Sequence, residues 1–410
     1  MTVSQFQTRL TTELRNRYIK SGAWKDITFY SCIERRAIEH PDLVVFIDER
    51  RSLTYKQLKE QVDRCAAFFK SLGIGEGDVV TMQFPNRVEF PIVFFSLELI
   101  GAIANKISPD FRRHEVEYIL RFSKSKAFVC AASFKGFNYA AMIDDLRGDL
   151  PSLKTIVVSG ETVVSNVHSL EAGLAQSAPL AQSDRVVMDP DAVMRMAFTS
   201  GTTGDPKGVM HSFNTTLYTV EVIIGEMGVT SDEVILIWLP VGLNWGYISL
   251  LQTVIAGCCA VLMERFDAER ALQLIEKHRI TFIPTAPASL LAILNVPCLQ
   301  KYDCSSLRVV VTGGASAAIE TIKAYQLNMK GHLLELYGML ETGFHTFTRF
   351  EDDPQKVNGT IGRVVGQMEL RIIDEEGNDV PYGAEGEIAA YGPSVHLGYF
   401  NNPTANSELF

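Results

Sequence analysis

Apolar and polar residues alternate along most of the chain with two different periods. Between residues 53 and 73, apolar side chains recur every three or four positions, which predicts a helix that ends at Gly73. The apolar run at 79–84 that follows is typical of a buried strand. The same succession of strand and helix returns as far as residue 336. It predicts an α/β fold of mostly parallel sheet flanked by helices.

The other expected elements follow from the same patterns. Further strands are expected at 126–131, 155–158, 193–198, 234–239, 259–263, 280–283, 307–312 and 333–336. Further helices are expected at 87–100, 112–122, 212–227, 247–256, 267–278, 287–294 and 316–326. The polar, irregular stretch from Gly160 to Asp191 is expected to cross between two stacked α/β halves.

After Arg349 the pattern changes to short strands, at 369–373 and 387–390, that are separated by turns. Helical periodicity is absent there, so we expect a small β-barrel-like subdomain. The expected units are a first α/β subdomain at 1–190, a second at 191–345 and the β subdomain at 346–410.

The composition is that of a globular protein and excludes some classes of function. Hydrophobic residues make up 47% and charged residues 21% of 410 positions, and the net charge is −10. A sequence-independent nucleic-acid binder would be basic instead. No apolar run reaches the ~20 residues of a membrane-spanning helix, and residues 1–20 lack the apolar core of a signal peptide. The length favours two or more subdomains.

Cysteine usage points to reduced thiols. The seven cysteines are Cys32, Cys65, Cys130, Cys258, Cys259, Cys298 and Cys304. None of them forms a Cys-x-x-Cys pair, and no histidine stands at ligand spacing from them. We therefore expect buried thiols, no metal site built from them, and a cytoplasmic location.

A loop of glycines and hydroxyl-bearing residues, with one lysine, follows the apolar run at 193–198. Its candidate ligand-binding residues are Thr199, Ser200, Gly201, Thr202, Thr203, Gly204 and Lys207. Glycines let the backbone approach a ligand closely, and successive amides in such turns form anion-binding concavities. The hydroxyls add donors and the lysine adds a mobile positive charge. Polyphosphate binding requires this chemistry.

This loop has two other interpretations. An ordinary linker would have a similar composition, because Gly, Ser and Thr are common in turns. A Walker-type phosphate loop needs four residues between its glycines and a Ser or Thr directly after the lysine. Only two residues separate Gly201 from Gly204, and Gly208 follows Lys207. The Walker spacing therefore fails.

Two further segments stand where expected strands end. Residues 312–316, Thr-Gly-Gly-Ala-Ser, join a strand to a helix, and ligands of open α/β sheets bind beyond the carboxyl ends of strands. In the segment 335–341, the ring of Tyr337 can stack on a purine and the carboxylate of Glu341 can hold Mg²⁺. Taken alone, the segment 312–316 is equally typical of a tight turn without a ligand, and the segment 335–341 is more typical of a core tyrosine and a surface acid.

The loop at 199–209 closely resembles the phosphate loop of the adenylate-forming enzymes, which include acyl-CoA synthetases, adenylation domains and luciferases. The segment 335–341 resembles that family's Tyr-Gly-x-Thr-Glu motif, and the similarity extends from about residue 25 to the end of the chain. Around 111–115 the chain looks closest to cyclohexanecarboxylate- and medium-chain acyl-CoA ligases.

The resemblance assigns roles to individual residues. It implies that Lys207 and Glu341 are catalytic, with Glu341 holding Mg²⁺. Besides the loop, the nucleotide-binding residues that it implies are Gly313, Gly314, Ala315, Glu335, Tyr337, Gly338, Met339 and Leu340. The acid pocket that it implies is lined by Leu243, Asn244, Trp245, Tyr247, Gly338 and Met339. Core aromatic packing is the alternative for Trp245 and Tyr247, whose bulk otherwise indicates an apolar, cyclic acid.

The chain departs from the family pattern at several positions. Leu340 replaces a threonine near the α-phosphate, at the cost of one hydrogen bond, typically about 0.5–1.5 kcal/mol. Leu243 and Phe213 stand where histidines are common, and Lys106 stands where proline is usual. His211, next to the loop, fits a structural and a functional role equally.

The function that the resemblance implies is ATP-dependent activation of a small carboxylic acid to acyl-AMP, with release of pyrophosphate. Coenzyme A is the expected acyl acceptor. An amino-acid amine and a carrier-protein thiol are the alternatives. A nucleotide-binding module without catalysis is the alternative from a different class. The resembling enzymes continue beyond the position of Phe410 into a small C-terminal domain with a catalytic lysine, so we expect this chain to correspond to their large N-terminal domain.

Overall fold

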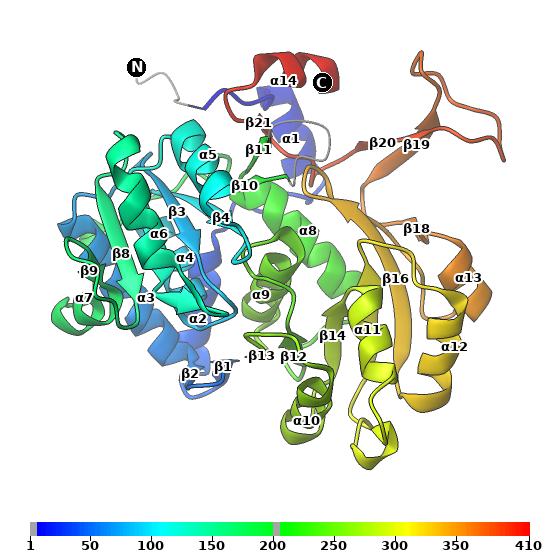
Figure 1. Ribbon diagram of the computed structural model, residues 1–410. Helices are drawn as coiled ribbons and strands as arrows, with labels where there is room; N and C mark the ends of the chain where they lie inside the picture. Colours follow the sequence, from blue (N-terminus) through cyan, green and yellow to red (C-terminus); the bar gives the residue numbers. More distant parts are fainter. Residues whose placement is uncertain (1–5, 200–205) are drawn as a thin grey trace.

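The computed structural model describes residues 6–199 and 206–410, and most of their strands belong to two large sheets (Figure 1). The first sheet has the order β21-β11-β10-β4-β3-β5-β8-β9. Its pairs from β10 to β9 are parallel, and β11 and β21 add an antiparallel edge. Its strands are β3 (Val79–Gln83), β4 (Ile103–Ile107), β5 (Ala127–Ala131), β8 (Thr155–Ser159), β9 (His168–Ser169), β10 (Arg195–Phe198), β11 (Gly208–His211) and β21 (Gly398–Tyr399).

The second sheet has the order β18-β17-β16-β15-β14-β12-β13-β1-β2. The six strands from β16 to β1 are parallel, with antiparallel strands at both edges. Its strands are β1 (Val44–Ile47), β2 (Ser52–Thr54), β12 (Val234–Ile237), β13 (Cys259–Leu262), β14 (Phe282–Thr285), β15 (Val309–Gly313), β16 (His332–Met339), β17 (Gly343–Phe347) and β18 (Arg363–Val364). Two hairpins stand apart, β6 (Ser133–Phe134) with β7 (Phe137–Asn138), and β19 (Glu369–Ile373) with β20 (Glu387–Tyr391).

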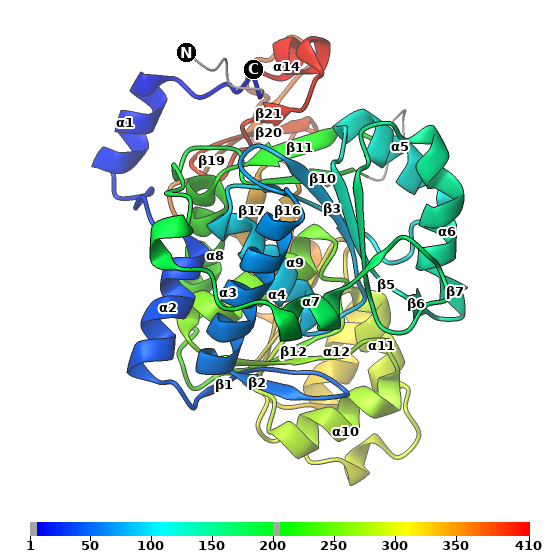
Figure 2. The same cartoon turned by 90° about the vertical axis from the view of Figure 1, so that its left-hand side faces the viewer.

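Helices lie on both faces of the sheets (Figures 1 and 2). They are α1 (Thr12–Lys20), α2 (Phe29–Glu39), α3 (Tyr55–Ser71), α4 (Glu89–Leu99), α5 (Arg113–Ser123), α6 (Tyr139–Leu146), α7 (Leu170–Gln176), α8 (Phe213–Glu226), α9 (Asn244–Ala256), α10 (Ala268–His278), α11 (Pro287–Leu294), α12 (Ile319–Asn328), α13 (Pro354–Gly359) and α14 (Pro403–Leu409). Within the described residues, no helix combines the length and apolar character required to cross a membrane.

Helices α8 and α9 form the layer between the two sheets. Helix α8 packs on α9 and β17, and α9 packs on β12, β13 and β14. From the other sheet, Arg195 of β10 reaches Thr216 in α8 and Tyr247 in α9. Every residue of α9 from Gly246 to Val254 is buried, as expected for a helix that is apolar on all sides. A single core cluster therefore spans both sheets.

The expected alternation of strands and helices up to residue 336 is confirmed, with some elements missed. Strand β4 was not expected, and β11 lies between the phosphate loop and α8, so the loop connects two antiparallel strands. All four residues of β11 are buried between β10 and β21. Helix α7 and strand β9 occupy part of the stretch 160–191 that was expected to be irregular.

The expectations for the part after Arg349 need correction. Helices α13 and α14 are present there. Asp353 caps α13 and Asn402 caps α14, and in each helix a proline occupies the first position after the cap. In place of a barrel-like unit, β18 and β21 extend the two large sheets, and β19 and β20 form a projecting hairpin (Figure 1).

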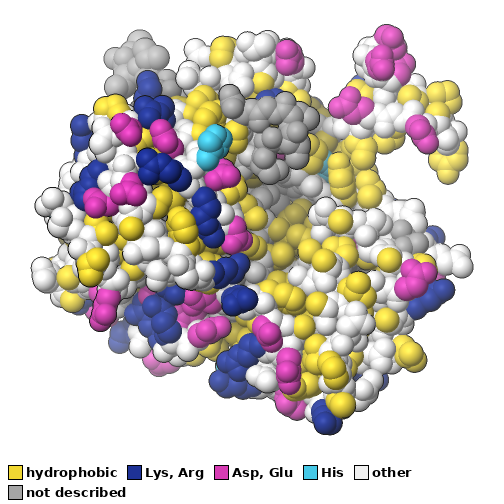
Figure 3. All heavy atoms as spheres, viewed as in Figure 1, with side chains coloured by type: hydrophobic (Ala, Val, Ile, Leu, Met, Phe, Trp, Pro, Cys, Tyr) yellow, Lys and Arg dark blue, Asp and Glu magenta, His cyan; other side chains and the backbone are white. Residues whose placement is uncertain are grey.

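The sheets also do not follow the expected division of the chain at residue 190. Strands β1 and β2 belong to the second sheet, and β10 and β11 belong to the first. The division into 1–190, 191–345 and 346–410 stays a prediction about domains. The face seen in Figure 3 is hollowed between the two halves, with Lys and Arg side chains along its left rim and hydrophobic ones over much of the right.

Candidate active site

A pocket of about 420 Å³ opens at the carboxyl ends of β15 and β16. It brings together five of the residues predicted to bind nucleotide, which are Gly314, Ala315, Glu335, Tyr337 and Gly338. The remaining lining residues are Ser316, Leu336, Gly359, Thr360 and Ile361. The position agrees with the general rule that ligands of α/β sheets bind where parallel strands end.

The glycines at the end of β15 are required by the backbone itself. Strands β15 and β16 are parallel neighbours, with Gly313 opposite Leu336. A Cβ atom on Gly313 would lie 2.7 Å from the Leu336 carbonyl oxygen, and Gly314 has a φ of +78°. Only glycine adopts that conformation without strain, so the turn brings bare backbone to the pocket.

The side chains of β16 on the pocket are held in defined orientations. The Thr312 hydroxyl donates to Glu335 Oε2, and the Glu335 amide donates to Thr348 Oγ1 over 2.8 Å. Burial raises the pKa of the Glu335 carboxyl, against the lowering effect of the Thr312 bond. The ring of Tyr337 is half-buried and meets the ring of His345 edge-on, with 5.5 Å between centroids.

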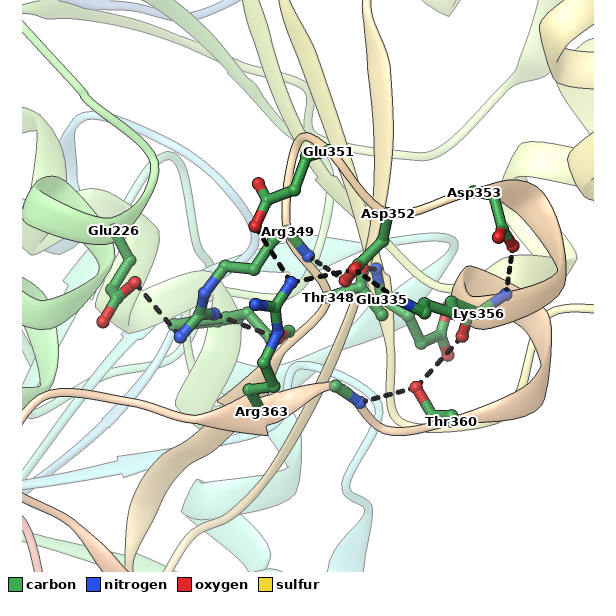
Figure 4. A network of polar contacts seen from close by, with 12 residues as sticks. Glu226, Glu335, Thr348, Arg349, Glu351, Asp352, Asp353, Lys356, Thr360 and Arg363 are labelled. Carbon is green, nitrogen blue, oxygen red and sulfur yellow. Dashed lines mark hydrogen bonds and ion pairs between the residues drawn. The ribbon is translucent and has the colours of Figure 1, made fainter.

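The third side of the pocket, at 359–361, is held by a network of charges (Figure 4). Arg349 contacts Glu226 of α8 at 3.3 Å, and Asp352 accepts from the Arg349 amide and from Arg363. The Thr360 hydroxyl donates to the carbonyl of Lys356 in α13. It accepts a hydrogen bond from the amide of Gly362. These contacts position the loop that carries Thr360 and its neighbours into the pocket.

The two predicted catalytic residues meet around one tyrosine. The ammonium of Lys207, just before β11, lies 5.0 Å from the ring centroid of Tyr399 on β21. The Tyr399 hydroxyl donates to Glu341 Oε1 over 3.1 Å. Burial and this carboxylate raise the pKa of Tyr399 above its ordinary value, so the hydroxyl keeps its proton. Residues from both large sheets therefore converge here.

The turn that carries Glu341 is anchored to the first sheet by its own backbone. The His396 amide donates to the Glu341 carbonyl over 2.6 Å, and the Ser394 hydroxyl donates to the Thr342 carbonyl over 2.6 Å. His211 Nε2 lies 2.8 Å from the Leu340 carbonyl. A carbonyl only accepts, so Nε2 carries the proton. Burial lowers the pKa of His211 well below its usual range, which supports a structural role.

The phosphate loop is closed at its base. The Thr199 amide donates to the Lys207 carbonyl, and the Lys207 amide donates to Thr199 Oγ1, each over 3.2 Å. The predicted ligand residues Ser200, Gly201, Thr202, Thr203 and Gly204 lie outside the described residues.

The predicted acid-pocket residues divide between two sides of α9. The indole of Trp245 comes within 3.2 Å of the Cβ position that a side chain on Gly313 would have, next to the pocket at the ends of β15 and β16. Asn244 is half-buried beside it, while Leu243 is 42% exposed and Met339 43% exposed. Tyr247 is fully buried on the opposite side, with its ring 4.9 Å from that of Phe94. The structure therefore does not bring Tyr247 to the pocket near Gly313.

Some residues of the site were not singled out from the sequence. Tyr399 and the segment 359–361 received no role from the sequence. Their only sequence signal is glycine next to polar or aromatic residues, which is common in turns. Their importance depends on pairing between β11 and β21 and on the turn after α13.

Comparison with known proteins agrees with this geometry. A family model described as "AMP-binding enzyme" matches residues 33–400. The chain is 28% identical to the vibriobactin-specific 2,3-dihydroxybenzoate-AMP ligase of Vibrio cholerae, over 97% of this chain and 73% of that protein. It is 28% identical to the medium-chain fatty-acid–CoA ligase of Escherichia coli, over 95% of this chain and 69% of the ligase.

Solved structures show the same fold. The apo structure of MbtA from Mycobacterium smegmatis is 29% identical and superposes with a TM-score of 0.89, over 98% of this chain and 73% of MbtA. The anthranilate CoA ligase AuaEII in complex with anthranoyl-AMP has a TM-score of 0.87 at 22% identity, over 94% and 73% of the two chains.

Proposed function

Because the chain belongs to the AMP-binding enzyme family, we propose that it activates a carboxylic acid with ATP to form acyl-AMP and release pyrophosphate. The observation that carries the proposal is the pocket in which Gly314, Ala315 and Tyr337 come together. The meeting of Lys207 and Glu341 around Tyr399 supports it further.

The proposed chemistry overcomes the poor reactivity of a carboxylate. Its negative charge resists nucleophilic attack, and a mixed anhydride with AMP removes that charge. One carboxylate oxygen attacks the α-phosphorus of ATP, and the bond from that phosphorus to the bridging oxygen breaks to release pyrophosphate. The protein's part is positioning and electrostatic stabilisation, with the Lys207 ammonium and the loop amides on the phosphates.

Glu341 is the proposed Mg²⁺ ligand. Its carboxylate accepts one hydrogen bond, from Tyr399, and keeps further acceptor capacity. Among the described residues no cluster of three or more His, Cys, Asp or Glu could hold a metal by itself. Mg²⁺ is commonly bound by one or two carboxylates together with substrate phosphates, so a lone Glu341 fits. The ion would neutralise phosphate charge.

The nucleotide and the acid are proposed to occupy adjoining sites. Adenine is placed against Tyr337 and the turn 313–315, and the acid against Trp245, Asn244 and Gly338. The short distance between the Trp245 indole and Gly313 supports this arrangement.

Coenzyme A is the proposed acyl acceptor, because relatives such as the Escherichia coli enzyme are named CoA ligases. A carrier-protein thiol and an amino-acid amine are the alternative acceptors. The transfer step is proposed to use a small C-terminal domain of the kind that the resembling enzymes carry. All seven cysteines are free thiols, which supports a cytoplasmic location.

Acid-dependent exchange of labelled pyrophosphate into ATP tests the proposal. Exchange that requires an acid is expected with the wild-type protein and is expected to be lost in Glu341→Gln. Exchange with none of a broad set of aliphatic and aromatic acids would contradict it. A matched surface variant, Glu385→Gln, is the control.

A nucleotide-binding module without catalysis is the second candidate. It is favoured by Leu340, which replaces the threonine that resembling enzymes place near the α-phosphate. Calorimetric binding of ATP without any exchange would support this candidate over the first.

A further inference from the structure

The N-terminal segment, residues 6–24, runs beside β21, although the two are far apart in the chain (Figures 1 and 2). The Arg9 amide donates to the Leu397 carbonyl, just before β21, over 2.9 Å. The rings of Phe6 and Phe400 lie 5.2 Å apart between centroids, and both are buried. The first described residues therefore pack directly on the strand that carries Tyr399.

Arg9 is the central contact, because it binds three successive carbonyls. Besides the bond from its amide, its guanidinium Nε donates to the His396 carbonyl over 2.7 Å and its Nη2 to the Val395 carbonyl over 3.0 Å. Hydrogen bonds from an ionised donor are roughly twice as strong as neutral ones. The Arg9 side chain therefore fixes the backbone of residues 395–397.

Trp24 holds the start of the same stretch. Its indole Nε1 donates to the Pro393 carbonyl over 3.0 Å. The indole is buried beside Tyr18, with 5.0 Å between ring centroids. A buried indole N–H requires an acceptor, and this carbonyl supplies it. Residues 393–397, called the linking segment below, are thus held on one side by two residues of the N-terminal segment.

The linking segment is bound on its other side to the turn that carries Glu341. The His396 amide donates to the Glu341 carbonyl, and the Ser394 hydroxyl donates to the Thr342 carbonyl, each over 2.6 Å. Both Ser394 and His396 are buried. His396 accepts from Arg9 through its carbonyl and donates to Glu341 through its amide. One residue therefore joins the N-terminal segment to this turn.

Glu341 has a second contact with the same part of the chain. Tyr399 stands two residues after Leu397, and its hydroxyl donates to Glu341 Oε1 over 3.1 Å. A shift of the backbone at 395–397 would thus reach Glu341 both at its carbonyl and at its carboxylate. Close-packed interiors transmit such displacements, and small misplacements of reacting groups reduce rates strongly.

We propose that Arg9 is a positioning residue for acid activation, which acts through the linking segment on Glu341 and Tyr399. The inference rests on the proposed function and deepens it, because Glu341 is the carboxylate proposed to hold Mg²⁺. Groups that orient a metal ligand affect metal affinity although they do not touch the ion. Arg9 stands one step further out, since it orients the backbone that holds the ligand.

Hydrogen–deuterium exchange tests the positioning without any ligand. The 410-residue chain is compared with Arg9→Met, which keeps an unbranched side chain and removes every guanidinium donor. Faster exchange is expected at residues 393–400 and also at 340–344, because the linking segment holds the turn. Faster exchange at 393–400 with 340–344 unchanged would overturn the inference.

Mg²⁺-dependent nucleotide binding is the second measurement. Calorimetry gives the affinity for ATP over a range of Mg²⁺ concentrations. Arg9→Met is expected to raise the Mg²⁺ concentration for half-maximal affinity at least about threefold, less than the roughly 10–100-fold typical for a direct partner of a metal ligand. In pyrophosphate exchange the KM for the acid should stay unchanged, because the proposed acid site at Asn244 and Trp245 is built on α9.

A matched variant separates positioning from stability. Arg36 Nη2 also donates to a distant carbonyl, that of Ala256, over 3.2 Å, at the opposite end of α9 from Trp245. Arg36→Met should lower the melting temperature without a change in the Mg²⁺ requirement. If Arg9→Met behaves in the same way, Arg9 has a structural role only and the inference is overturned.

Two milder variants keep the test valid if Arg9→Met folds poorly. Arg9→Lys keeps the charge and part of the donors, so its Mg²⁺ requirement should lie between those of the wild type and Arg9→Met. Trp24→Phe keeps a buried ring and removes only the bond to Pro393, and should raise the Mg²⁺ requirement as well. A wild-type requirement in both variants would contradict the inference.

The results separate this inference from the proposed function. If the wild-type protein binds ATP with Mg²⁺ but shows no exchange with any acid, adenylation fails, and a raised Mg²⁺ requirement in Arg9→Met still supports the positioning role. Acid-dependent exchange with the same Mg²⁺ requirement in both proteins would leave adenylation standing and overturn the inference. No binding of ATP by the wild-type protein would overturn both.

Discussion

Lys207 lies just before β11 of the first sheet, Glu341 lies between β16 and β17 of the second, and Tyr399 contacts both residues. Its ring faces the ammonium and its hydroxyl donates to the carboxylate, so one side chain sets the relative positions of the two proposed catalytic groups. At this scale the sequence identified the two charged residues. It did not identify the tyrosine, because their common neighbour comes from β21, almost 200 residues after the loop in the chain.

Replacing Lys207 tests the proposed role of its charge. In Lys207→Met, acid-dependent pyrophosphate exchange is expected to fall by about 10²–10³-fold, the usual effect of removing one group that stabilises transition-state charge. Lys207→Arg keeps the charge and should lose less. Unchanged exchange in Lys207→Met, at a wild-type melting temperature, would contradict the role of this lysine.

Tyr399 is predicted to position these groups rather than to react. Tyr399→Phe removes one hydrogen bond, worth about 0.5–1.5 kcal/mol, and should raise the Mg²⁺ concentration needed for half-maximal exchange by a few fold. Tyr399→Leu also removes the ring beside Lys207, so the apparent KM for ATP should rise as well. Identical kinetics in both variants would show that only one of the two contacts matters.

At the scale of elements, local sequence signals located most helices and the parallel strands. Helix α3 has a capping box formed by Thr54 and Gln57, and its apolar period is strong. Strand β11 was missed because its four residues show no distinct pattern, and it exists only because β10 and β21 pair with it. Helices α13 and α14 were missed although their caps and prolines are visible in the sequence.

The sequence assigns Gly338 to ligand binding, whereas the structure explains the need for glycine at this position by close packing between β16 and β17. A Cβ atom there would lie 2.4 Å from the Gly343 carbonyl oxygen of β17. Gly338→Ala should therefore lower the free energy of unfolding by about 1–3 kcal/mol through overpacking, measured by denaturant titration.

Gly225→Ala is the matched control for that substitution. Gly225 is in α8, and a Cβ atom there meets nothing within 4 Å. The change should raise stability by roughly 0.5–1 kcal/mol, because alanine favours a helix. Equal effects of the two substitutions would contradict the packing argument.

At the scale of the whole molecule, buried histidines where the sheets meet should set the response to acid. Burial lowers the pKa of His345 and of His396 to about 4. In the unfolded chain each titrates near 6.5, so from pH 6.5 down to 4 only the unfolded state takes up these protons. Stability is therefore present above pH 6.5 and lost as pH falls toward 4, on the order of 3 kcal/mol for each histidine.

Glu98 acts in the opposite direction. Burial raises its pKa to about 7, so the native state holds a proton that the unfolded state releases from about pH 4.5 upward. One such group is outweighed by two histidines. His345→Gln with His396→Gln should flatten the loss of stability on acidification, and Glu98→Gln should steepen it, as measured by urea unfolding from pH 4 to 7. A wild-type stability that rises on acidification would contradict this.

The sequence by itself determined the α/β class, the order of most elements and the residue types in the segments predicted to bind nucleotide and acid. These properties depend on local periods, caps and short motifs, which adjacent residues express without the rest of the chain. Only the tertiary structure decided which sheet each strand joins, that Tyr247 faces away from Trp245, and that Lys106 and Arg195 lie against one ring. Those contacts join segments far apart in the chain, through strand register and helix packing that no local pattern encodes.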